Sequence, residues 1–330
     1  MIKTTPPAEQ RTIFICAPAN SYTGGPTLAH QLCWKLRKFG YNAVMYYYIA
    51  RDGVCPVHEN YLKYELPYTV KLDDRAENIV VTPETNVNLL FKVKRAKKVI
   101  WWMSVDFYFV YLQNLELSRS RIRRLLGLKA RRYDILRKDL LHFAQCRYIT
   151  DFLKEQGIDT DRIFYLSDYL DRDFINNSQS DAVRNDAVLY NPKKGFEFTE
   201  QLIAKAPDIN WTPLINLTPA QMAEYLRSSK VYIDFGNHPG KDRIPREAAI
   251  SGCCVITGRR GSARFSEDVF IPEEFKFEDK NENLDAIISL IRNMLADYPA
   301  YAGRFDAYRE RIKGEEQQFD YDVKKIFSVL

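Results

Sequence analysis

The sequence lacks several features that would define its class at once. None of its six cysteines forms a C-x-x-C pair or has a histidine at metal-ligand spacing, so neither a zinc site nor a disulfide framework is indicated. No repeat of fixed short period is present. The net charge of +5 over 330 residues is too small to indicate nucleic-acid binding by itself. We therefore expect a reducing compartment, no metal and no nucleic-acid partner.

Long apolar runs are also missing. The most apolar stretch, residues 99–112, is shorter than the about 20 residues of a membrane-spanning helix, and it contains Asp106. The opening stretch MIKTTPPAEQRT lacks the apolar region of a signal peptide, which predicts a cytoplasmic protein. With 46% hydrophobic and 28% charged residues, the composition is that of a folded globular chain of about two domains.

Short apolar runs alternate with helical patterns along the first half of the chain. Residues 12–17 predict a strand, and the leucine spacing after Pro26 predicts a helix that Gly40 ends. This alternation predicts a doubly wound α/β domain. Further strands are expected at residues 42–49, 78–81, 98–103, 147–150 and 162–166, with a helix at 133–144.

The polar segment 171–186 has no periodicity and is typical of a linker. After it the alternation restarts, which predicts two Rossmann-like domains, residues 1–172 and 173–330, facing each other across a cleft. The final helix is expected to be able to pack back on the first domain. In the second domain we expect strands at 187–190, 231–235 and 253–257, and helices at 195–205, 219–228, 245–251 and 283–298.

Three polar loops follow predicted strands. The first carries Tyr22, Gly24 and Gly25 before a helix, and adjacent glycines at a helix N-terminus suit an anion, although a plain turn fits equally well. In the second domain Lys193, Lys194 and Gly195 take the same place and suit a diphosphate, unless the lysines are only solvated surface residues. The run 234–247 concentrates charged side chains that need partners, which indicates ligand binding.

Three patches resemble glycosyltransferases of the GT-B fold, particularly the large retaining group called family 4. The segment EAAISGCCVIT, which begins at Glu247, resembles that family's E-A-x-x-x-G-x-P-V-I segment. Gly24 and Gly25, with the leucines that follow, resemble its opening G-G pattern, and Lys194 with Gly195 resembles its K-G. The resemblance implies a C-terminal domain that binds a nucleotide-sugar, an N-terminal domain that binds the acceptor, and no cofactor.

The resemblance also implies roles for single residues. Glu247 would accept hydrogen bonds from the ribose hydroxyls, and Lys194 would stabilise the departing diphosphate without a metal. The loop with Tyr22, Gly24 and Gly25 would close on the phosphates or the acceptor.

Two positions differ from the family pattern. Pro239 stands where the first Glu of the E-x7-E motif would be, and Leu189 stands where an arginine usually precedes the lysine. We expect Arg243 to replace the missing cation. The sugar would then be contacted by His238, Lys241 or Asp242.

Candidates for the catalytic base come from the N-terminal domain. Asp106 interrupts an aromatic run at the end of a predicted strand. If the enzyme inverts, it would take the acceptor proton; the alternative is that it only caps the next helix. His30 lies one turn into the first predicted helix, where it would reach the cleft or be a structural histidine.

The strongest local charge asymmetry lies between Arg119 and Lys138, with nine basic residues and one acidic residue. Preceded by aromatic residues, it predicts a surface for anionic lipid headgroups and a peripheral membrane location. A solvated basic helix face is a second interpretation. Nucleic-acid binding is a third, although no recognisable RNA- or DNA-binding module accompanies the patch.

These observations predict a glycosyltransferase that moves a sugar from a nucleotide donor to a hydroxyl of a glycan or lipid-linked glycan. By resemblance alone, the glycan would belong to a bacterial surface polysaccharide. Two alternatives remain: an epimerase of nucleotide-sugars with the same fold, and a noncatalytic module that binds nucleotide-sugars or an anionic surface.

Overall fold

The computed structural model describes residues 11–119, 123, 125–178 and 183–330. Contacts within the chain divide it into two compact units. Unit 1 comprises Met1–Gln145, Ile149–Ser167 and Asp320–Leu330, and unit 2 comprises Cys146–Tyr148 and Asp168–Phe319. Each unit contains one parallel β-sheet with helices between its strands, which is the α/β class that the alternating pattern predicts.

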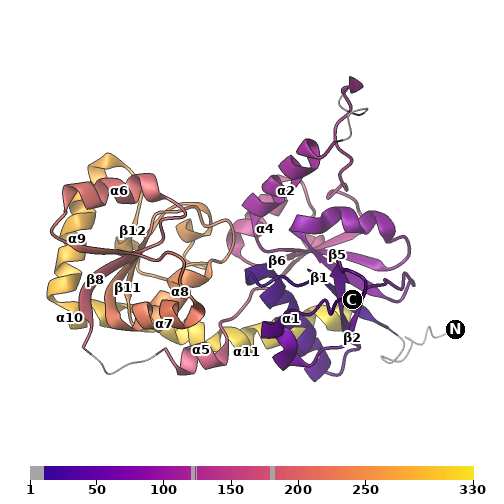
Figure 1. Ribbon diagram of the computed structural model, residues 1–330, viewed down its shortest axis with the longest axis horizontal. Coiled ribbons are helices and arrows are strands. Elements are labelled where there is room, and N and C mark those ends of the chain that lie inside the picture. Colours follow the sequence, from indigo (N-terminus) through magenta and orange to yellow (C-terminus); the bar gives the residue numbers. More distant parts are fainter. Residues whose placement is uncertain (1–10, 120–122, 124, 179–182) are drawn as a thin grey trace. The chain divides into compact units, whose positions relative to one another are not determined.

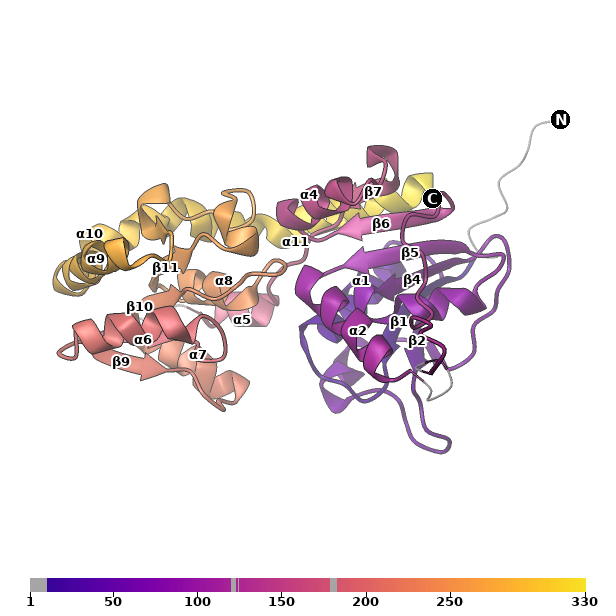
Figure 2. The same cartoon turned by 90° about the horizontal axis from the view of Figure 1, so that it is seen from above.

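Unit 1 has a seven-stranded sheet in the order β3-β2-β1-β4-β5-β6-β7, and Figure 2 shows β6, β5, β4, β1 and β2 side by side in this order. Helix α1 and the end of α11 share one face, where Lys35 and Asp320 form an ion pair at 2.7 Å, while α2 packs with η2 on the other (Figure 1). The strands are β1 (Ile13–Pro18), β2 (Ala43–Tyr48), β3 (Tyr68–Thr69), β4 (Ile79–Pro83), β5 (Lys97–Trp102), β6 (Leu140–Ala144) and β7 (Ile163–Tyr165). The helices are α1 (Gly24–Lys38), α2 (Val105–Leu117), α4 (Arg147–Glu155) and α11 (Asp306–Val329), with short 3-10 helices η1 (Glu59–Tyr64), η2 (Glu84–Lys92) and η3 (Thr160–Arg162).

The first β-α-β unit forms as its sequence predicts. Helix α1 buries Leu28, Leu32 and Leu36, and it ends where Gly40 takes a positive φ of 85°. The Tyr41 N–H then donates to the Leu36 carbonyl at 3.0 Å, which satisfies a helix-end acceptor.

Two sequence predictions in unit 1 are wrong. Residues 133–144 do not form a helix, because Leu140–Ala144 is the strand β6, buried between β5 and β7. Residues 147–150 are not a strand but the start of α4, whose buried Ile149, Phe152 and Leu153 follow the spacing of a helix. Short apolar runs do not distinguish the two states, and the neighbouring strands decided between them here.

Unit 2 has a five-stranded sheet in the order β12-β11-β10-β8-β9. Helices α7 and α8 contact each other on one face, and α9 contacts α6 on the other (Figure 1). The strands are β8 (Asn185–Tyr190), β9 (Asn210–Pro213), β10 (Ser229–Asp234), β11 (Cys254–Gly258) and β12 (Lys276–Phe277). The helices are α5 (Arg172–Asn176), α6 (Phe196–Lys205), α7 (Pro219–Ser228), α8 (Arg243–Ile250), α9 (Leu284–Ala296), α10 (Tyr298–Ala302) and the first part of α11, with 3-10 helices η4 (Gly261–Arg264), η5 (Glu273–Phe275), η6 (Asn281–Asn283) and η7 (Gly303–Phe305).

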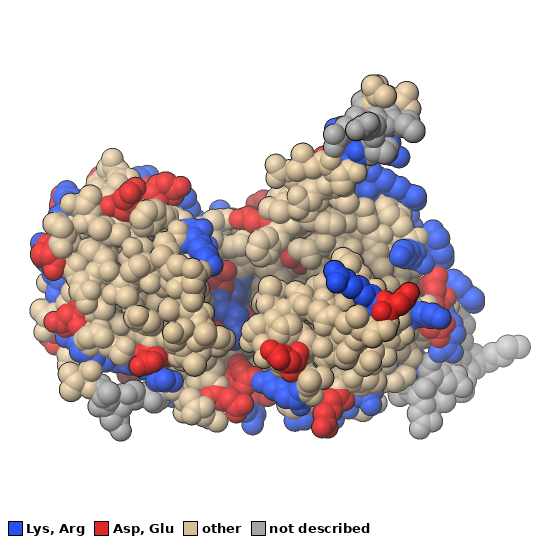
Figure 3. Space-filling view, viewed as in Figure 1, with Lys and Arg blue, Asp and Glu red and all other residues tan. Residues whose placement is uncertain are grey.

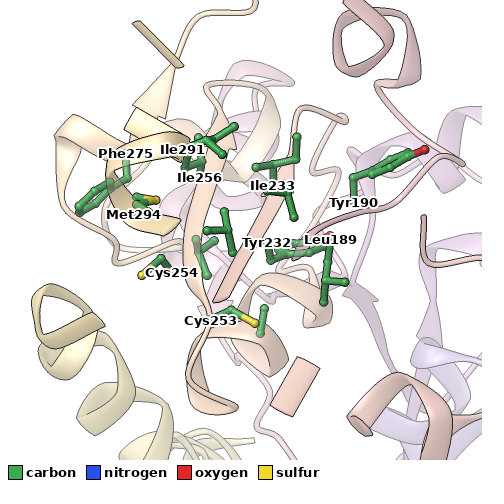
Figure 4. Packing of buried hydrophobic residues seen from close by; sticks show 14 of the residues in the cluster. Leu189, Tyr190, Tyr232, Ile233, Cys253, Cys254, Ile256, Phe275, Ile291 and Met294 are labelled. Carbon is green, nitrogen blue, oxygen red and sulfur yellow. The ribbon is translucent and has the colours of Figure 1, made fainter. Parts of the chain in front are cut away.

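The core of unit 2 is continuous across its sheet. Figure 4 shows Tyr232 and Ile233 of β10 packed between residues of β8 and β11, with Ile291 and Met294 of α9 close by. The predicted apolar face of α9 is confirmed, because Leu284, Ile287, Ile288 and Ile291 are buried. Helix α7 begins at a capping box between Thr218 and Gln221, which fixes its start at the predicted residue.

Candidate functional site

The candidate site of unit 2 lies where the connections of its sheet reverse direction. Strand β9 lies beyond β8 on one side and β11 lies beyond β10 on the other, so chain segments leave this pair of strands in opposite directions. In parallel α/β sheets, ligands bind outside the carboxyl ends of the strands at such a point. The loops here are residues 191–195 after β8 and 235–242 after β10. They and the first turns of α8 contain all eight predicted donor-binding residues: Lys193, Lys194, Gly195, His238, Lys241, Asp242, Arg243 and Glu247.

Two glycines let these loops touch. Gly195 precedes α6 with a φ of +64°, and a Cβ there would overlap the backbone carbonyl of Phe235. A Cβ on Gly236 would lie 2.8 Å from the Cβ of Lys194. Only glycine allows this approach, and it holds Lys194 directly against the loop after β10.

A chain of charged groups connects the two loops. The Lys194 ammonium forms an ion pair with Asp242, and the other carboxylate contact of Asp242 is His238 Nδ1 at 3.0 Å. His238 Nε2 lies 3.6 Å from Asp234 Oδ1, and the imidazole is fully buried. The Asp234 carboxylate also accepts hydrogen bonds from Tyr232 Oη and the Gly236 N–H.

The electrostatics of this cluster favour its charged forms. Burial alone would lower the pKa of His238, but Asp234 and Asp242 outweigh it, and the pKa of His238 is raised. Burial would raise the pKa of Asp242, but His238 and Lys194 hold it below its ordinary value. The Asp242 carboxylate therefore lies between two cationic groups.

Asp234, His238 and Asp242 bring three ligand-type atoms within 4.8 Å of one another. The Lys194 ammonium pairs with Asp242, and its positive charge would repel a metal ion at this position. We describe the cluster as an ion-pair chain, and the expected absence of a metal stays a prediction.

Arg243 and Glu247 form the next pair along α8. Arg243 Nε donates to Glu247 Oε1 at 3.2 Å, one helical turn apart. The Glu247 side chain is 13% exposed and that of Arg243 31%, so the arginine is the more accessible of the two. This geometry does not test whether Glu247 contacts the ribose or whether Arg243 replaces the missing cation, so both stay predictions.

Lys241 lies in a buried ion network. Its ammonium lies 2.8 Å from Glu315 Oε1 and 3.8 Å from Asp168 Oδ1. Arg246, which the sequence analysis did not single out, is 1% exposed and binds Asp168 at 2.6 Å and Glu315 at 2.8 Å. Burial opposes the charged form of Asp168, but Arg246 and Lys241 lower its pKa. The Lys241 ammonium thus lies on these carboxylates, and its predicted contact with the sugar stays a prediction.

In unit 1, the loop between β1 and α1 carries Tyr22, Gly24 and Gly25. Tyr22 is 48% exposed, and its ring stacks on His58 with centroids 5.4 Å apart. Gly24 is exposed, whereas a Cβ on Gly25 would lie 3.6 Å from the Met103 side chain. The predicted phosphate or acceptor contact of this loop stays a prediction.

The two catalytic candidates of unit 1 differ in their surroundings. His30 is buried, with Nδ1 2.6 Å from the Pro26 carbonyl and Nε2 2.7 Å from Tyr47 Oη, and burial lowers its pKa to about 4. Its ring nitrogens are thus occupied within unit 1. Asp106 is half-buried in the first turn of α2, whose cap is Ser104 Oγ, an acceptor for the Phe107 N–H at 3.1 Å. The expected alternative, a cap formed by Asp106, does not occur.

Unit 1 contains a buried acid, Glu84, that no sequence prediction identified. Glu84 follows β4, next to β1 in the sheet, and its Oε2 accepts a hydrogen bond from the Met103 N–H at 3.1 Å. Burial raises the pKa of Glu84 to about 7, although backbone N–H groups act in the opposite direction. No motif in the sequence marks this glutamate, because its burial depends on strand order.

The basic segment between Arg119 and Lys138 is only partly described, because residues 120–122 and 124 lie outside the described residues. Figure 3 shows Lys and Arg side chains around the end of α2, where Arg119 Nη1 donates to the Leu128 carbonyl at 3.1 Å. Residues 128–134 are irregular and not a helix face. No helix among the described residues is both long and apolar enough to span a membrane. The membrane contact stays a prediction.

Comparison with known proteins identifies the fold of this chain but assigns it to no sequence family. No family model matches the chain, and no curated protein matches it. Among solved structures, Anabaena HepE in complex with UDP-glucose is similar, with a TM-score of 0.61 and 10% identity over 97% of this chain and 100% of that one.

Two further similar structures agree with the first. Sucrose-phosphate synthase from Thermosynechococcus elongatus has a TM-score of 0.62 and 12% identity, covering 96% of this chain and 98% of its own. A glycosyltransferase from Rickettsia africae has a TM-score of 0.57 and 11% identity, covering 97% of each chain. The chain therefore has the GT-B fold of two Rossmann-like units, which confirms the predicted fold class.

Proposed function

We propose that this protein is a glycosyltransferase that moves a sugar from a nucleotide-sugar to a hydroxyl of a glycan. The observation that carries the proposal is the pair of interlocked loops after β8 and β10, which hold Lys194 beside the start of α6 and Glu247 in α8. Similarity to structures such as HepE with UDP-glucose supports the class of donor. A role in bacterial surface polysaccharide synthesis is the finer part of the proposal.

In this reaction the bond between the sugar C1 and the diphosphate oxygen breaks while the acceptor oxygen bonds to C1. Negative charge develops on the diphosphate, where Lys194, Lys193 and the N–H groups at the start of α6 would stabilise it. Glu247 would accept from the ribose hydroxyls. If the reaction inverts the configuration at C1, the acceptor proton goes to a base, for which Asp106 stays our candidate.

The first test is donor binding. Thermal unfolding would be followed with a panel of uridine, guanosine, thymidine and cytidine diphosphates and their sugars. A ligand at about 100 times its Kd stabilises the folded state by about 2.7 kcal/mol, which raises the Tm by several degrees. We expect one base to give this shift.

Single substitutions test where the donor binds. Lys194→Ala removes a charge-assisted contact worth about 1.5–3 kcal/mol, so donor affinity should fall by about 10- to 100-fold. Glu247→Ala should weaken binding of the nucleotide and spare that of inorganic diphosphate. Lys205→Ala is the matched control, because Lys205 forms an exposed pair with Asp285 at the other end of α6. Absence of a shift with any nucleotide in the wild-type protein would contradict the proposal.

Turnover separates the classes that share this fold. Slow hydrolysis of the donor without acceptor supports a transferase. Reversible conversion of the donor to another sugar would indicate an epimerase, and binding without turnover would indicate a noncatalytic module.

A further inference from the structure

His238 differs from the other buried histidines of this protein. Burial lowers the pKa of His30 to about 4 and that of His142 to about 3, so both are neutral at pH 7. His238 is at least as buried, yet its pKa moves in the opposite direction because carboxylates lie on both sides of the ring. The surroundings of His238 thus favour its charged form, whereas those of His30 and His142 favour the neutral form.

The charge of His238 is connected to the donor loop through one carboxylate. Asp242 contacts both His238 Nδ1 and the Lys194 ammonium, and these two cations share its negative charge. On the opposite side, Asp234 faces His238 and is itself held by Tyr232 Oη. Helix η4 contacts the histidine through its backbone, where the Ser262 N–H donates to the His238 carbonyl at 2.8 Å.

We propose that His238 is a positioning residue that controls how strongly Lys194 binds the diphosphate of the donor. The inference rests on the proposed function and deepens it. When the imidazole is charged, it attracts the Asp242 carboxylate and weakens the ion pair between Asp242 and Lys194, so that the Lys194 ammonium is available to phosphate. When the imidazole is neutral, Asp242 pairs only with Lys194 and competes with the incoming anion for the ammonium.

Donor binding is therefore linked to protonation of His238. When a diphosphate draws Lys194 away from Asp242, the Asp242 carboxylate interacts only with His238. This interaction stabilises the charged imidazole further. Binding takes up a proton, and affinity falls as the pH rises. The diphosphate of the donor does not itself titrate in this range, because both phosphates of a nucleotide-sugar are esterified.

The test is isothermal titration of the full-length protein with the nucleotide-sugar identified in the panel, from about pH 6 to about pH 9. Buffers of different ionisation enthalpy report proton uptake. We expect wild-type affinity to fall by about tenfold across this range, a typical coupling between two sites. His238→Asn should remove the proton uptake and bind weakly at every pH.

Asp242→Asn gives the decisive result, because it should act in the opposite direction. Without the competing carboxylate, Lys194 should bind the donor at high pH at least as tightly as the wild-type protein does at low pH. A purely structural role of the cluster would make both variants weaker. His58→Asn is the matched control, since asparagine keeps the cap that His58 Nδ1 forms with the Asn60 N–H, and it should retain wild-type pH dependence.

Three results would overturn the inference. Wild-type pH dependence in a folded His238→Asn variant would show that another group titrates. Weak binding by Asp242→Asn would show that Asp242 does not compete for Lys194 but contacts the donor directly or has only a structural role. Affinity that rises with pH and disappears with a chelator would show a metal in the cluster. Failure of the proposed function is separate, because then no nucleotide-sugar binds the wild-type protein at any pH.

Discussion

The two units stabilise their buried titratable groups in different ways. In unit 2, Arg246 is fully buried but remains charged between Asp168 and Glu315, and His238 is stabilised as a cation. In unit 1, burial acts without a countercharge, so the pKa of Glu84 rises and that of His30 falls. In unit 2 these buried groups therefore have partners that favour their charged forms, whereas in unit 1 burial favours the neutral forms of Glu84 and His30.

This difference follows from what surrounds each group. A buried charge costs several kcal/mol unless another charge and hydrogen bonds offset the lost hydration. Unit 2 brings loops, a helix start and α11 together around its charged side chains. The predictions below test this contrast by removing one group at a time.

The largest effect is expected in the buried network of unit 2. Arg246→Ala leaves Asp168 and Glu315 without their guanidinium, so the free energy of unfolding should fall by about 3–5 kcal/mol. Urea denaturation measures this. A loss below about 1 kcal/mol would contradict the paired state of the network.

Glu84→Gln in unit 1 should change the pH dependence of stability. The pKa of Glu84 is about 7 in the folded protein against an ordinary 4.5, so the folded state binds this proton more tightly. The wild-type protein should therefore lose stability as the pH rises from about 4.5 to about 7, by about 2–3 kcal/mol from this group. Urea denaturation of Glu84→Gln across this range should lack that loss. An unchanged pH profile would show that Glu84 is ionised when folded.

His30→Gln should change the stability of the protein at acidic pH. The pKa of His30 is about 4 when folded and 6.5 ordinarily, so its stabilising effect is complete above pH 6.5 and is lost as the pH falls toward 4. Protonation linked to His30 should lower the free energy of unfolding of the wild-type protein by about 2–3 kcal/mol over that range. Denaturation curves at several pH values should show a smaller acid loss in His30→Gln. An equal acid loss in both proteins would mean that His30 is charged when folded.

The smallest effect is expected for an exposed pair in unit 2. Arg292 donates to Asp208 at 2.9 Å, and both side chains are more than half exposed. Arg292→Ala should change the free energy of unfolding by less than about 1 kcal/mol, and less still in high salt. A larger effect would mean that pairing, and not burial, explains the stability of the Arg246 network.

Much of the fold could be predicted from the sequence because the signals are local. The leucine spacing of α1, the stop at Gly40, and the Thr218–Gln221 capping box each lie within one element. The apolar pattern of α9 likewise predicted its buried face. The predictions for residues 133–144 and 147–150 were wrong because the strand or helix state of these residues depended on neighbours distant in the sequence.

The candidate donor site was predictable in its residues but not in their contacts. Gly195, Lys194 and Glu247 were identified by type and spacing after predicted strands. No sequence pattern pairs Arg246 with Asp168 and Glu315, or indicates that Lys241 joins them. These partners lie far apart along the chain.

The sequence by itself determined the alternation of strands and helices and which loops carry charge, because hydrophobic periodicity and turn residues act over a few positions. Only the tertiary structure decided which of those charges persist in the interior. The pKa of His238 depends on Asp234 and Asp242, and the environment of Lys194 depends on a loop more than forty positions away that two glycines bring within contact. Electrostatic energy follows distance and burial in space, and neither is fixed by position in the chain.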